Sequence, residues 1–382
     1  MQVLLLSLVL AQDPEPPVKF QKQVLTERYL ADGIASGDFN RDGKPDIVSG
    51  PFWYEGPEFK VAHEIYPAVD FELPPNPTNS MYSYVWDFNG DGWPDLLRLG
   101  RVHLHQAVWF ENPQGKPGPW KQHFVFERVL GESPPFIVHG GAPALVCHWE
   151  NRWGLLQPDR SDATKPWVFN PITAEGKYPQ FYHGTGIGDV DGDGLPDLLL
   201  NEGWWKQTKE GPWTAHAFKF GDKGGAQMFS LDVNGDGRMD VITSLDAHGW
   251  GLAWWEQLPD GDFKKHVLMG DRSEEAKYGV AFSQPHALAM ADLDGDGLTD
   301  LVVGKRRWAH GPKGDVEPEA EPVLYWFRLV RKPDVKFVPY KIDGASGVGV
   351  QLTVTDVTGD GVPDILTVSK LGAFLFKTER RK

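Results

Sequence analysis

The sequence predicts an all-β protein, a seven-bladed β-propeller whose blades each contain four short strands. Three observations support this fold class: an acidic nonapeptide recurs along the chain, an aromatic pair follows it, and a further strand-like segment follows the pair. Glycine, proline and tryptophan occur 43, 31 and 16 times in 382 residues. This composition favours many turns and short aromatic strands over long helices.

The acidic nonapeptide has the form D-x-[DNT]-x-D-G-x-x-D. Its six copies begin at Asp38, Asp87, Asp189, Asp232, Asp292 and Asp356. The interval between the second and third copies is roughly double the others, and the uncharged segment 136–146 lies in its middle. Four residues of this segment align with the acidic or amide positions of the nonapeptide: Phe136, Val138, Gly140 and Ala144. We therefore predict seven repeats, six of them acidic.

The aromatic pairs locate the remaining strands of each repeat. They begin at Trp53, Trp109, Trp204, Trp254 and Trp326, and a strand-like segment follows each pair. The last repeat has residues for only three strands, and residues 20–25 (FQKQVL) match the missing fourth. We therefore predict that residues 12–382 form a single propeller domain closed by the N-terminal strand, which leaves no open sheet edge.

Each acidic nonapeptide predicts a calcium site. Oxygens at the first, third, fifth and ninth positions, a backbone carbonyl at the seventh and a glycine at the sixth describe a cage for a hard cation. The predicted ligands, with the seventh-position residue contributing its carbonyl, are Asp38, Asn40, Asp42, Lys44 and Asp46; Asp87, Asn89, Asp91, Trp93 and Asp95; Asp189, Asp191, Asp193, Leu195 and Asp197; Asp232, Asn234, Asp236, Arg238 and Asp240; Asp292, Asp294, Asp296, Leu298 and Asp300; Asp356, Thr358, Asp360, Val362 and Asp364. An EF-hand is excluded, because no Glu stands at the twelfth position and the flanking residues favour strands.

These motifs resemble the FG-GAP or VCBS repeat family of calcium-binding propellers, which includes integrin α-subunit heads and many secreted bacterial proteins. The resemblance covers nearly the whole chain after residue 11 and departs from the family pattern in the third repeat and at Thr358. It implies about six Ca²⁺ ions per chain. Since the six loops contain 20 carboxylates and Cys147 is the only cysteine, we expect calcium to stabilise the fold in place of disulfides.

The overall charge and the N-terminal segment restrict the partners. A formal net charge of −15 disfavours nucleic acids and anionic membranes, which need a basic surface. Residues 1–11 are apolar and end at Ala11, as in a secretory signal peptide, so we expect a secreted or periplasmic protein. No later run of 18 apolar residues predicts a membrane span.

Histidines concentrate on the face opposite the acidic loops. His183 and His286 each stand six residues before the first Asp of their repeats, which predicts that both lie at the entrance of the central channel. With Glu202, Asp246 or His248 they can hold an additional transition-metal ion or act as acid and base. The alternative is that they are polar caps on inner strands. Four other histidines fall in the outer strands and are predicted to be structural: His63, His123, His216 and His266.

Two functions remain open from the sequence. The first is a secreted module that binds a carbohydrate or an extracellular protein on the histidine-rich face, because aromatic rings and charged groups together suit sugars. Its predicted ligand-binding residues are His248, Trp250, Glu202, Asp246, Arg306 and Trp308. The second is a metal-assisted sugar lyase or dehydratase, by resemblance to enzymes that use calcium-loop propellers. Its catalytic candidates are His183, His286, Arg306 and His310.

Overall fold

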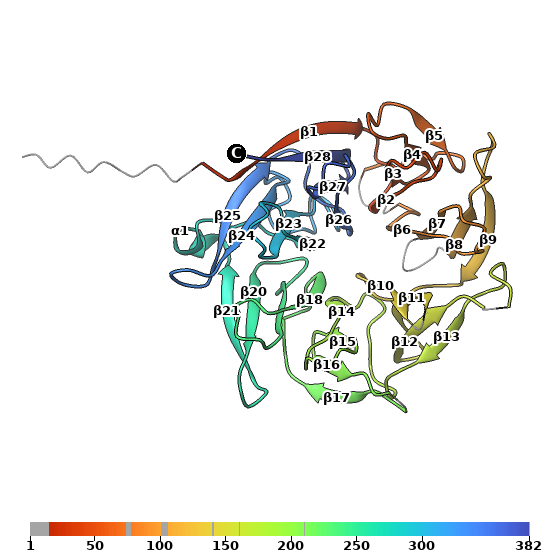
Figure 1. Cartoon of the computed structure of the whole chain (residues 1–382). Helices are drawn as coiled ribbons and strands as arrows, with labels where there is room; N and C mark the ends of the chain where they lie inside the picture. The colour runs from red at the N-terminus through yellow and green to blue at the C-terminus, as the bar shows by residue number, and fades with distance from the viewer. Residues whose placement is uncertain are drawn as a thin grey trace, which may run out of the picture.

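The computed structural model describes residues 15–73, 78–100, 106–139, 141–159, 161–209 and 211–381. The predicted signal peptide 1–11 and Gly140 lie outside the described residues. The fold is an all-β propeller: four-stranded units surround a central opening, each running from an inner strand to an outer one (Figure 1).

The strands fall into four concentric sets. The inner strands are β2 (Ile34–Gly37), β6 (Tyr82–Trp86), β10 (Phe136–His139), β14 (Thr185–Gly188), β18 (Gln227–Leu231), β22 (Pro285–Ala291) and β26 (Leu352–Thr355). The second strands are β3 (Asp46–Ser49), β7 (Asp95–Leu99), β11 (Ala142–Trp149), β15 (Asp197–Leu200), β19 (Asp240–Ser244), β23 (Asp300–Lys305) and β27 (Asp364–Ser369).

The third strands are β4 (Phe52–Tyr54), β8 (Ala107–Glu111), β12 (Arg152–Gln157), β16 (Gly203–Lys206), β20 (Leu252–Gln257), β24 (Leu324–Val330) and β28 (Gly372–Arg380). The outer strands are β5 (Ala62–Glu64), β9 (Lys121–Phe126), β13 (Val168–Pro171), β17 (Thr214–Ala217), β21 (Phe263–Met269), β25 (Lys336–Asp343) and β1 (Val18–Thr26). A 3₁₀ turn (Arg272–Glu274) and α1 (Glu275–Tyr278) lie between β21 and β22.

The hydrogen bonds divide these strands into five four-stranded sheets and one eight-stranded sheet. The prediction of seven separate blades was therefore wrong. Two units are joined because β14 pairs in parallel with β18, with Thr185 opposite Gln227 and Gly186 opposite Met228. A Cβ atom on Gly186 would lie 2.0 Å from the carbonyl oxygen of Met228, so this close pairing requires glycine.

The N-terminal strand β1 pairs antiparallel with β28, from Val18 opposite Arg380 to Val24 opposite Phe374. Residues 20–25, predicted to be the missing outer strand of the last repeat, therefore lie on the outer edge of the sheet that contains β26, β27 and β28. In Figure 1 this is where the red and dark blue ends of the chain lie side by side.

The third unit differs from the sequence alignment. Residues 136–139 and 142–149 are the strands β10 and β11, and Val138 lies opposite Pro143. Phe136 and Val138, which align with loop positions of the acidic units, are therefore strand residues. Ala144 lies in the second strand, as the ninth-position aspartates of the other units do. Because this unit lacks the nonapeptide, the loop between its first two strands, β10 and β11, is much shorter than the corresponding loop of the acidic units.

The predicted structural histidines stack on the tryptophans of the neighbouring strand. Ring centroids lie 4.0–4.3 Å apart in four pairs: Trp53 with His63, Trp109 with His123, Trp204 with His216 and Trp254 with His266. In three of them the Nε2 atom also contacts a carboxylate at 2.7–2.9 Å, from Glu55, Glu111 or Glu256. These contacts agree with the structural role predicted for them.

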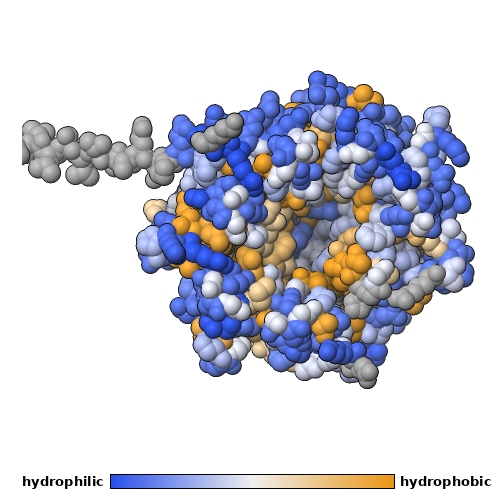
Figure 2. All heavy atoms as spheres, viewed as in Figure 1, coloured by the Kyte–Doolittle hydropathy of each residue, from blue (hydrophilic) through white to orange (hydrophobic). Residues whose placement is uncertain are grey.

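A cavity of about 440 Å³ lies along the axis between the inner strands β6, β10, β14, β18, β22 and β26. Figure 2 shows a hollow in the middle of the ring with apolar residues on its walls. Two glutamines brace it. The amide of Gln227 donates to the carbonyl of Val350 at 2.9 Å, and that of Gln351 donates to the carbonyl of Ser83 at 2.9 Å. Within the described ranges, no helix has the length and apolar character needed to cross a membrane.

Candidate functional site

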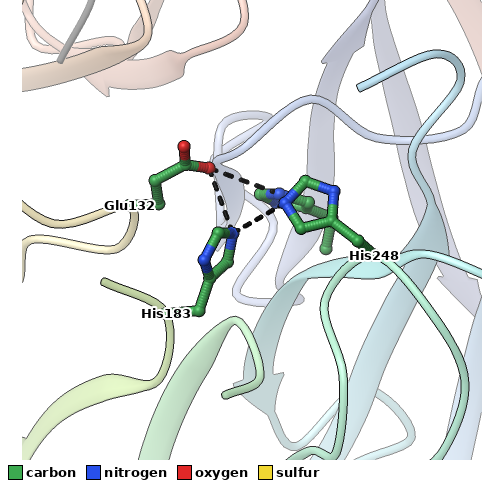
Figure 3. Close-up of side chains that lie close together, drawn as sticks. Glu132, His183 and His248 are labelled. Atoms are coloured by element: carbon green, nitrogen blue, oxygen red, sulfur yellow. Dashed lines mark hydrogen bonds and ion pairs between the residues drawn. The ribbon is translucent and has the colours of Figure 1, made fainter. Parts of the chain in front are cut away.

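Four potential metal ligands meet at the end of the axial cavity that lies opposite the acidic loops. Glu132 precedes β10, His183 precedes β14, His248 follows β19 and His286 is the second residue of β22. Because the acidic loops follow the C-terminal ends of the inner strands, residues at the N-terminal ends of those strands lie on the other face. Figure 3 shows the side chains of Glu132, His183 and His248 pointing toward one another.

The spacing of the ligand atoms fits one small metal ion. His183 Nε2 lies 2.9 Å from His248 Nε2 and 3.2 Å from Glu132 Oε2, and His286 Nε2 lies 3.6 Å from Glu132 Oε2. All four ligand atoms lie within 4.8 Å of one another. Ligands about 2.0–2.1 Å from a tetrahedral zinc ion lie about 3.3 Å apart, so the three short distances bracket the tetrahedral value.

The protonation states also suit a metal ion, which requires neutral imidazoles and an ionised carboxylate. His183 Nδ1 contacts the carbonyl of Phe181 at 2.9 Å, so in the neutral ring this nitrogen carries the hydrogen and Nε2 presents a lone pair. Burial, with the charge of Arg306, lowers the pKa of His286 to about 4. Burial also lowers the pKa of His248 far below its usual range. Burial opposes ionisation of Glu132, but the nearby imidazoles of His183 and His286 hold its pKa well below the usual value.

Arg306 covers one side of this centre. Its Nη1 atom lies 2.9 Å from His286 Nε2 and 4.0 Å from Glu132 Oε2. The residue is only 4% exposed. Its Nε atom is buried with no hydrogen-bond partner among the described residues. The guanidinium therefore holds the lone pair that His286 would offer to a metal ion.

A second group of buried charges adjoins Arg306. Asp32 is 1% exposed and accepts hydrogen bonds from the Tyr29 hydroxyl at 2.8 Å and the Thr78 hydroxyl at 3.2 Å. Lys370 Nζ lies 3.9 Å from Asp32 Oδ1 and 4.9 Å from the centre of the Tyr29 ring. Burial lowers the pKa of Lys370 to about 8, with Asp32 opposing and Arg306 assisting the shift.

The structure brings four of the predicted ligand-binding and catalytic residues together. The remaining candidates contact other groups. His183, His248, His286 and Arg306 form the centre, and the ring of His310 lies 4.5 Å from that of His248. His310 is itself exposed, and its Nδ1 atom lies 3.2 Å from Asp315 Oδ1.

The four remaining ligand-binding candidates contact other groups. Glu202 accepts a hydrogen bond from Tyr182, and Asp246 accepts one from the backbone of His248 and pairs with Lys223. The guanidinium of Arg272 lies over the Trp250 ring. Trp308 donates to the carbonyl of Pro318 and lies under Arg307.

Sequence reasoning missed Glu132, Asp32 and Lys370. The third repeat lacks the acidic nonapeptide by which the other repeats were aligned. The residues before β10 could therefore not be aligned with those before the other inner strands, and Glu132 was not compared with His183. Asp32 and Lys370 are charged residues next to strands, and only their burial, which the sequence does not reveal, distinguishes them from surface charges.

The acidic loops share one geometry. The ninth-position aspartates are fully buried and begin the second strands: Asp46, Asp95, Asp197, Asp240, Asp300 and Asp364. Asp240, for example, accepts the backbone N–H of Val233 at 3.0 Å and that of Gln257 at 2.8 Å. The other five accept the equivalent pair of N–H groups. The ninth aspartate thus ties the start of the loop to the third strand.

Carboxylates converge in these loops. Oxygens of the first, third and ninth residues lie within 4.8 Å of one another in two loops, in Asp189, Asp191 and Asp197 and in Asp292, Asp294 and Asp300. Burial raises the pKa of the ninth residue, to about 6 at Asp240 and about 7 at Asp300. In the last loop the Thr358 hydroxyl lies 3.1 Å from Asp364 Oδ2, to which it can donate.

Basic side chains enter three of the loops. Lys206, at the end of β16, contacts Asp191 and lies 2.9 Å from Asp193. Arg328 in β24 contacts the corresponding carboxylates of Asp294 and Asp296. Arg238 contacts Asp236. The sequence analysis did not anticipate these internal cations, which neutralise part of the charge that a metal ion would neutralise.

Comparisons with known proteins bear on the fold and the repeat. No curated protein matches the sequence. Among solved structures, BBS1N in complex with ARL6DN, soaked with lead, has 10% identity and a TM-score of 0.50, covering 96% of this chain and 97% of that one. A putative 6-phosphogluconolactonase from Bacteroides uniformis has 11% identity and a TM-score of 0.44, covering 90% of this chain and 98% of that one. Rhamnogalacturonan lyase YesW has 13% identity and a TM-score of 0.46, covering 94% and 72%.

These structural likenesses concern the fold alone. A family comparison adds that residues 232–303 match the FG-GAP-like repeat, from the acidic loop at Asp232 into β23. The matched segment includes two of the acidic nonapeptides. The chain is therefore an all-β propeller that contains an FG-GAP-like repeat.

Proposed function

We propose that this propeller is a ligand-binding protein whose binding site is a single transition-metal centre at the axial cavity. The observation that carries this proposal is the convergence of Glu132, His183, His248 and His286 within 4.8 Å. Three imidazoles and one carboxylate favour zinc or a similar transition metal over calcium or magnesium, which prefer oxygen ligands.

The surroundings support a site that meets a ligand. The side chains of His183 and Glu132 are 11% and 12% exposed, whereas that of His286 is fully buried, so solvent reaches the centre at His183 and Glu132. A metal ion held there by the four side chains would supply Lewis acidity to a ligand oxygen that binds as a fifth ligand. The chain's own residues would orient that ligand: Arg306 from one side and His310 from the rim.

The acidic loops are proposed to bind calcium, in keeping with the spacing of their oxygens. On this proposal calcium, at about six ions per chain, stabilises the fold and takes no direct part in ligand binding. We also propose that β1 closes the ring. The apolar residues 1–11 support export, and the ligand is proposed to be a carbohydrate or an extracellular protein.

One observation favours a second candidate, a metal-assisted lyase or dehydratase. Lys370 is 5% exposed, and burial lowers its pKa to about 8. An amine with this pKa is a general base near neutral pH. In an elimination it would take the proton from the carbon next to a carbonyl or carboxylate, while the carbon–oxygen bond to the leaving group breaks. Incubation with polyuronates, followed by ultraviolet absorbance of unsaturated products, tests this candidate.

Metal analysis tests the main proposal. Purified protein, dialysed against zinc and then against metal-free buffer, is expected to retain one equivalent of zinc besides calcium. His183→Ala and His286→Ala are each expected to lose it, and His216→Ala, which removes an exposed outer-strand histidine, is expected to keep it. Cobalt substitution adds a spectroscopic measurement, because tetrahedral cobalt absorbs strongly in the visible range. A wild-type protein without a retained equivalent would contradict the proposal.

A further inference from the structure

We infer that the ligand of this centre carries an oxyanion, a carboxylate or a phosphate group, which binds between the metal ion and the guanidinium of Arg306. This inference rests on the proposed metal centre and names the chemical class of its ligand. It follows from three features: the partner that Arg306 now has, the balance of buried charge, and the open side of the centre.

Arg306 loses its partner when a metal ion binds. Its Nη1 atom now donates to the lone pair of His286 Nε2, at 2.9 Å. A metal ion coordinated by His286 takes that same lone pair, so the two cannot be satisfied together. Nη1 then joins Nε, which already lacks a partner among the described residues. Burying a guanidinium with two unsatisfied donors is costly, and a new acceptor removes that cost.

The buried charges point to an anion as that acceptor. Arg306 and Lys370 are positive, Asp32 and Glu132 are negative, and all are buried or nearly so. These four charges cancel without metal, and the nearby buried Asp315 and Lys305 cancel one another, so a divalent ion leaves two positive charges. Such a charge in a poorly solvated site requires compensation. Arginine binds the oxygens of carboxylates and phosphates in a two-point geometry that a neutral hydroxyl cannot match.

Besides the proposed metal ligand Glu132, the described residues include a competing acceptor, Asp32. Its Oδ1 atom has no hydrogen-bond partner among the described residues and lies 3.9 Å from Lys370 Nζ. A turn of Arg306 toward Asp32 would satisfy the guanidinium but would leave the two positive charges of the site unchanged. An external oxyanion would both accept hydrogen bonds from the guanidinium and compensate the positive charge. It can reach the centre where the side chains of His183 and Glu132 are partly exposed.

A matched pair of sugars tests the inference. Zinc-loaded wild-type protein is titrated in a calorimeter with galacturonate, with galactose and with inorganic phosphate. We expect galacturonate or phosphate to bind at least tenfold more tightly than galactose, and the stronger of the two identifies the oxyanion. Equal affinity for all three, or binding of neither anion, would overturn the inference.

Variants locate the effect. Arg306→Gln is expected to keep one equivalent of zinc and to lose the preference for the anion, while Arg306→Lys retains part of it. The matched control is Arg307→Gln, which removes the neighbouring arginine that lies over Trp308 and is expected to leave the preference unchanged. Retained preference in Arg306→Gln would overturn the inference. Zinc content separates the two proposals, since a protein that holds zinc but shows no anion preference refutes only this one.

Discussion

The two faces of the ring place their charged residues in different ways. On one face the same acidic loop occurs six times, and each loop is organised by hydrogen bonds within nine residues and one link to a nearby strand. On the other face the centre occurs once, and its four ligands come from four separate parts of the chain. The comparison teaches that a local motif can stabilise each repeat on its own, whereas the centre exists only in the assembled ring.

Calcium removal should have the largest effect and should fall on the first face. A calcium-selective chelator is expected to lower the melting temperature by well over ten degrees. If calcium occupies the loops as proposed, each site would contribute about 2.7 kcal/mol at a hundredfold excess of calcium over Kd. Each kcal/mol shifts the midpoint by about 2–4 °C in larger domains. Calorimetry with and without the chelator measures the shift, and added calcium should reverse it. A midpoint unchanged within error would remove the stabilising role from the loops.

Within one loop, the buried ninth aspartate should matter more than the exposed fifth one. Asp240→Ala leaves the N–H groups of Val233 and Gln257 without their partner, at about 1–3 kcal/mol each. Asp236→Ala removes an exposed carboxylate and is expected to cost less than about 1 kcal/mol. Denaturant unfolding in the presence of the chelator compares the two without a contribution from calcium. Equal losses would show that the ninth aspartate has no separate structural role.

On the other face, the buried charge of Lys370 should make stability depend on pH. Burial lowers its folded-state pKa to about 8, below the unfolded value, so between these values the unfolded chain holds the proton more often. Stability should therefore rise as the pH increases from 8 toward 10.5, by about 2–3 kcal/mol. The variant Lys370→Met should lack this rise in stability. It keeps the other charged and titratable groups around position 370, which are Tyr29, Asp32, Arg306 and Asp315. Denaturant unfolding at pH 7 and pH 10 measures it, and parallel curves for the two proteins would refute the assignment.

The smallest expected effect concerns the internal cations of the loops. Lys206→Met removes the ammonium group that contacts Asp191 and Asp193. Partly exposed ion pairs contribute about 0–1 kcal/mol, so calcium affinity at this loop should rise by up to about fivefold. Calcium titration of the variant and of the control Lys219→Met, which changes an exposed lysine, checks this. A weaker affinity in Lys206→Met would mean that the lysine helps to shape the site.

The face with the acidic loops was largely predictable from the sequence. Its residues are close together along the chain, so a nine-residue pattern identified them and placed them between the first and second strands. The parallel pairing of β14 with β18 was not predictable, because it depends on the contact between Gly186 and Met228, which are distant in sequence. The third repeat was misaligned for a related reason, since nothing in it replaced the acidic residues as a marker.

The histidine face was only half predictable. The common offset of His183 and His286 from their loops placed both at one end of the channel, and His248 followed from the same topology. Arg306 was also among the predicted residues, and it contacts His286 of its own unit at 2.9 Å. Glu132 completes the centre through a contact between units, at 3.2 Å from His183. Such contacts depend on the curvature of the ring, which no local pattern encodes.

The parallel ladder between β14 and β18 also has a mechanical consequence. Among the described residues it is the only sheet pairing that joins two four-stranded units, and these are the units that carry His183 and His248. When the ring flexes, these two units should move together as one rigid body. Most of the bending should then occur at the junctions between units that lack such a ladder. The two imidazoles would then keep their spacing while the rest of the ring flexes, so this one sector would set the geometry that they offer to a metal ion.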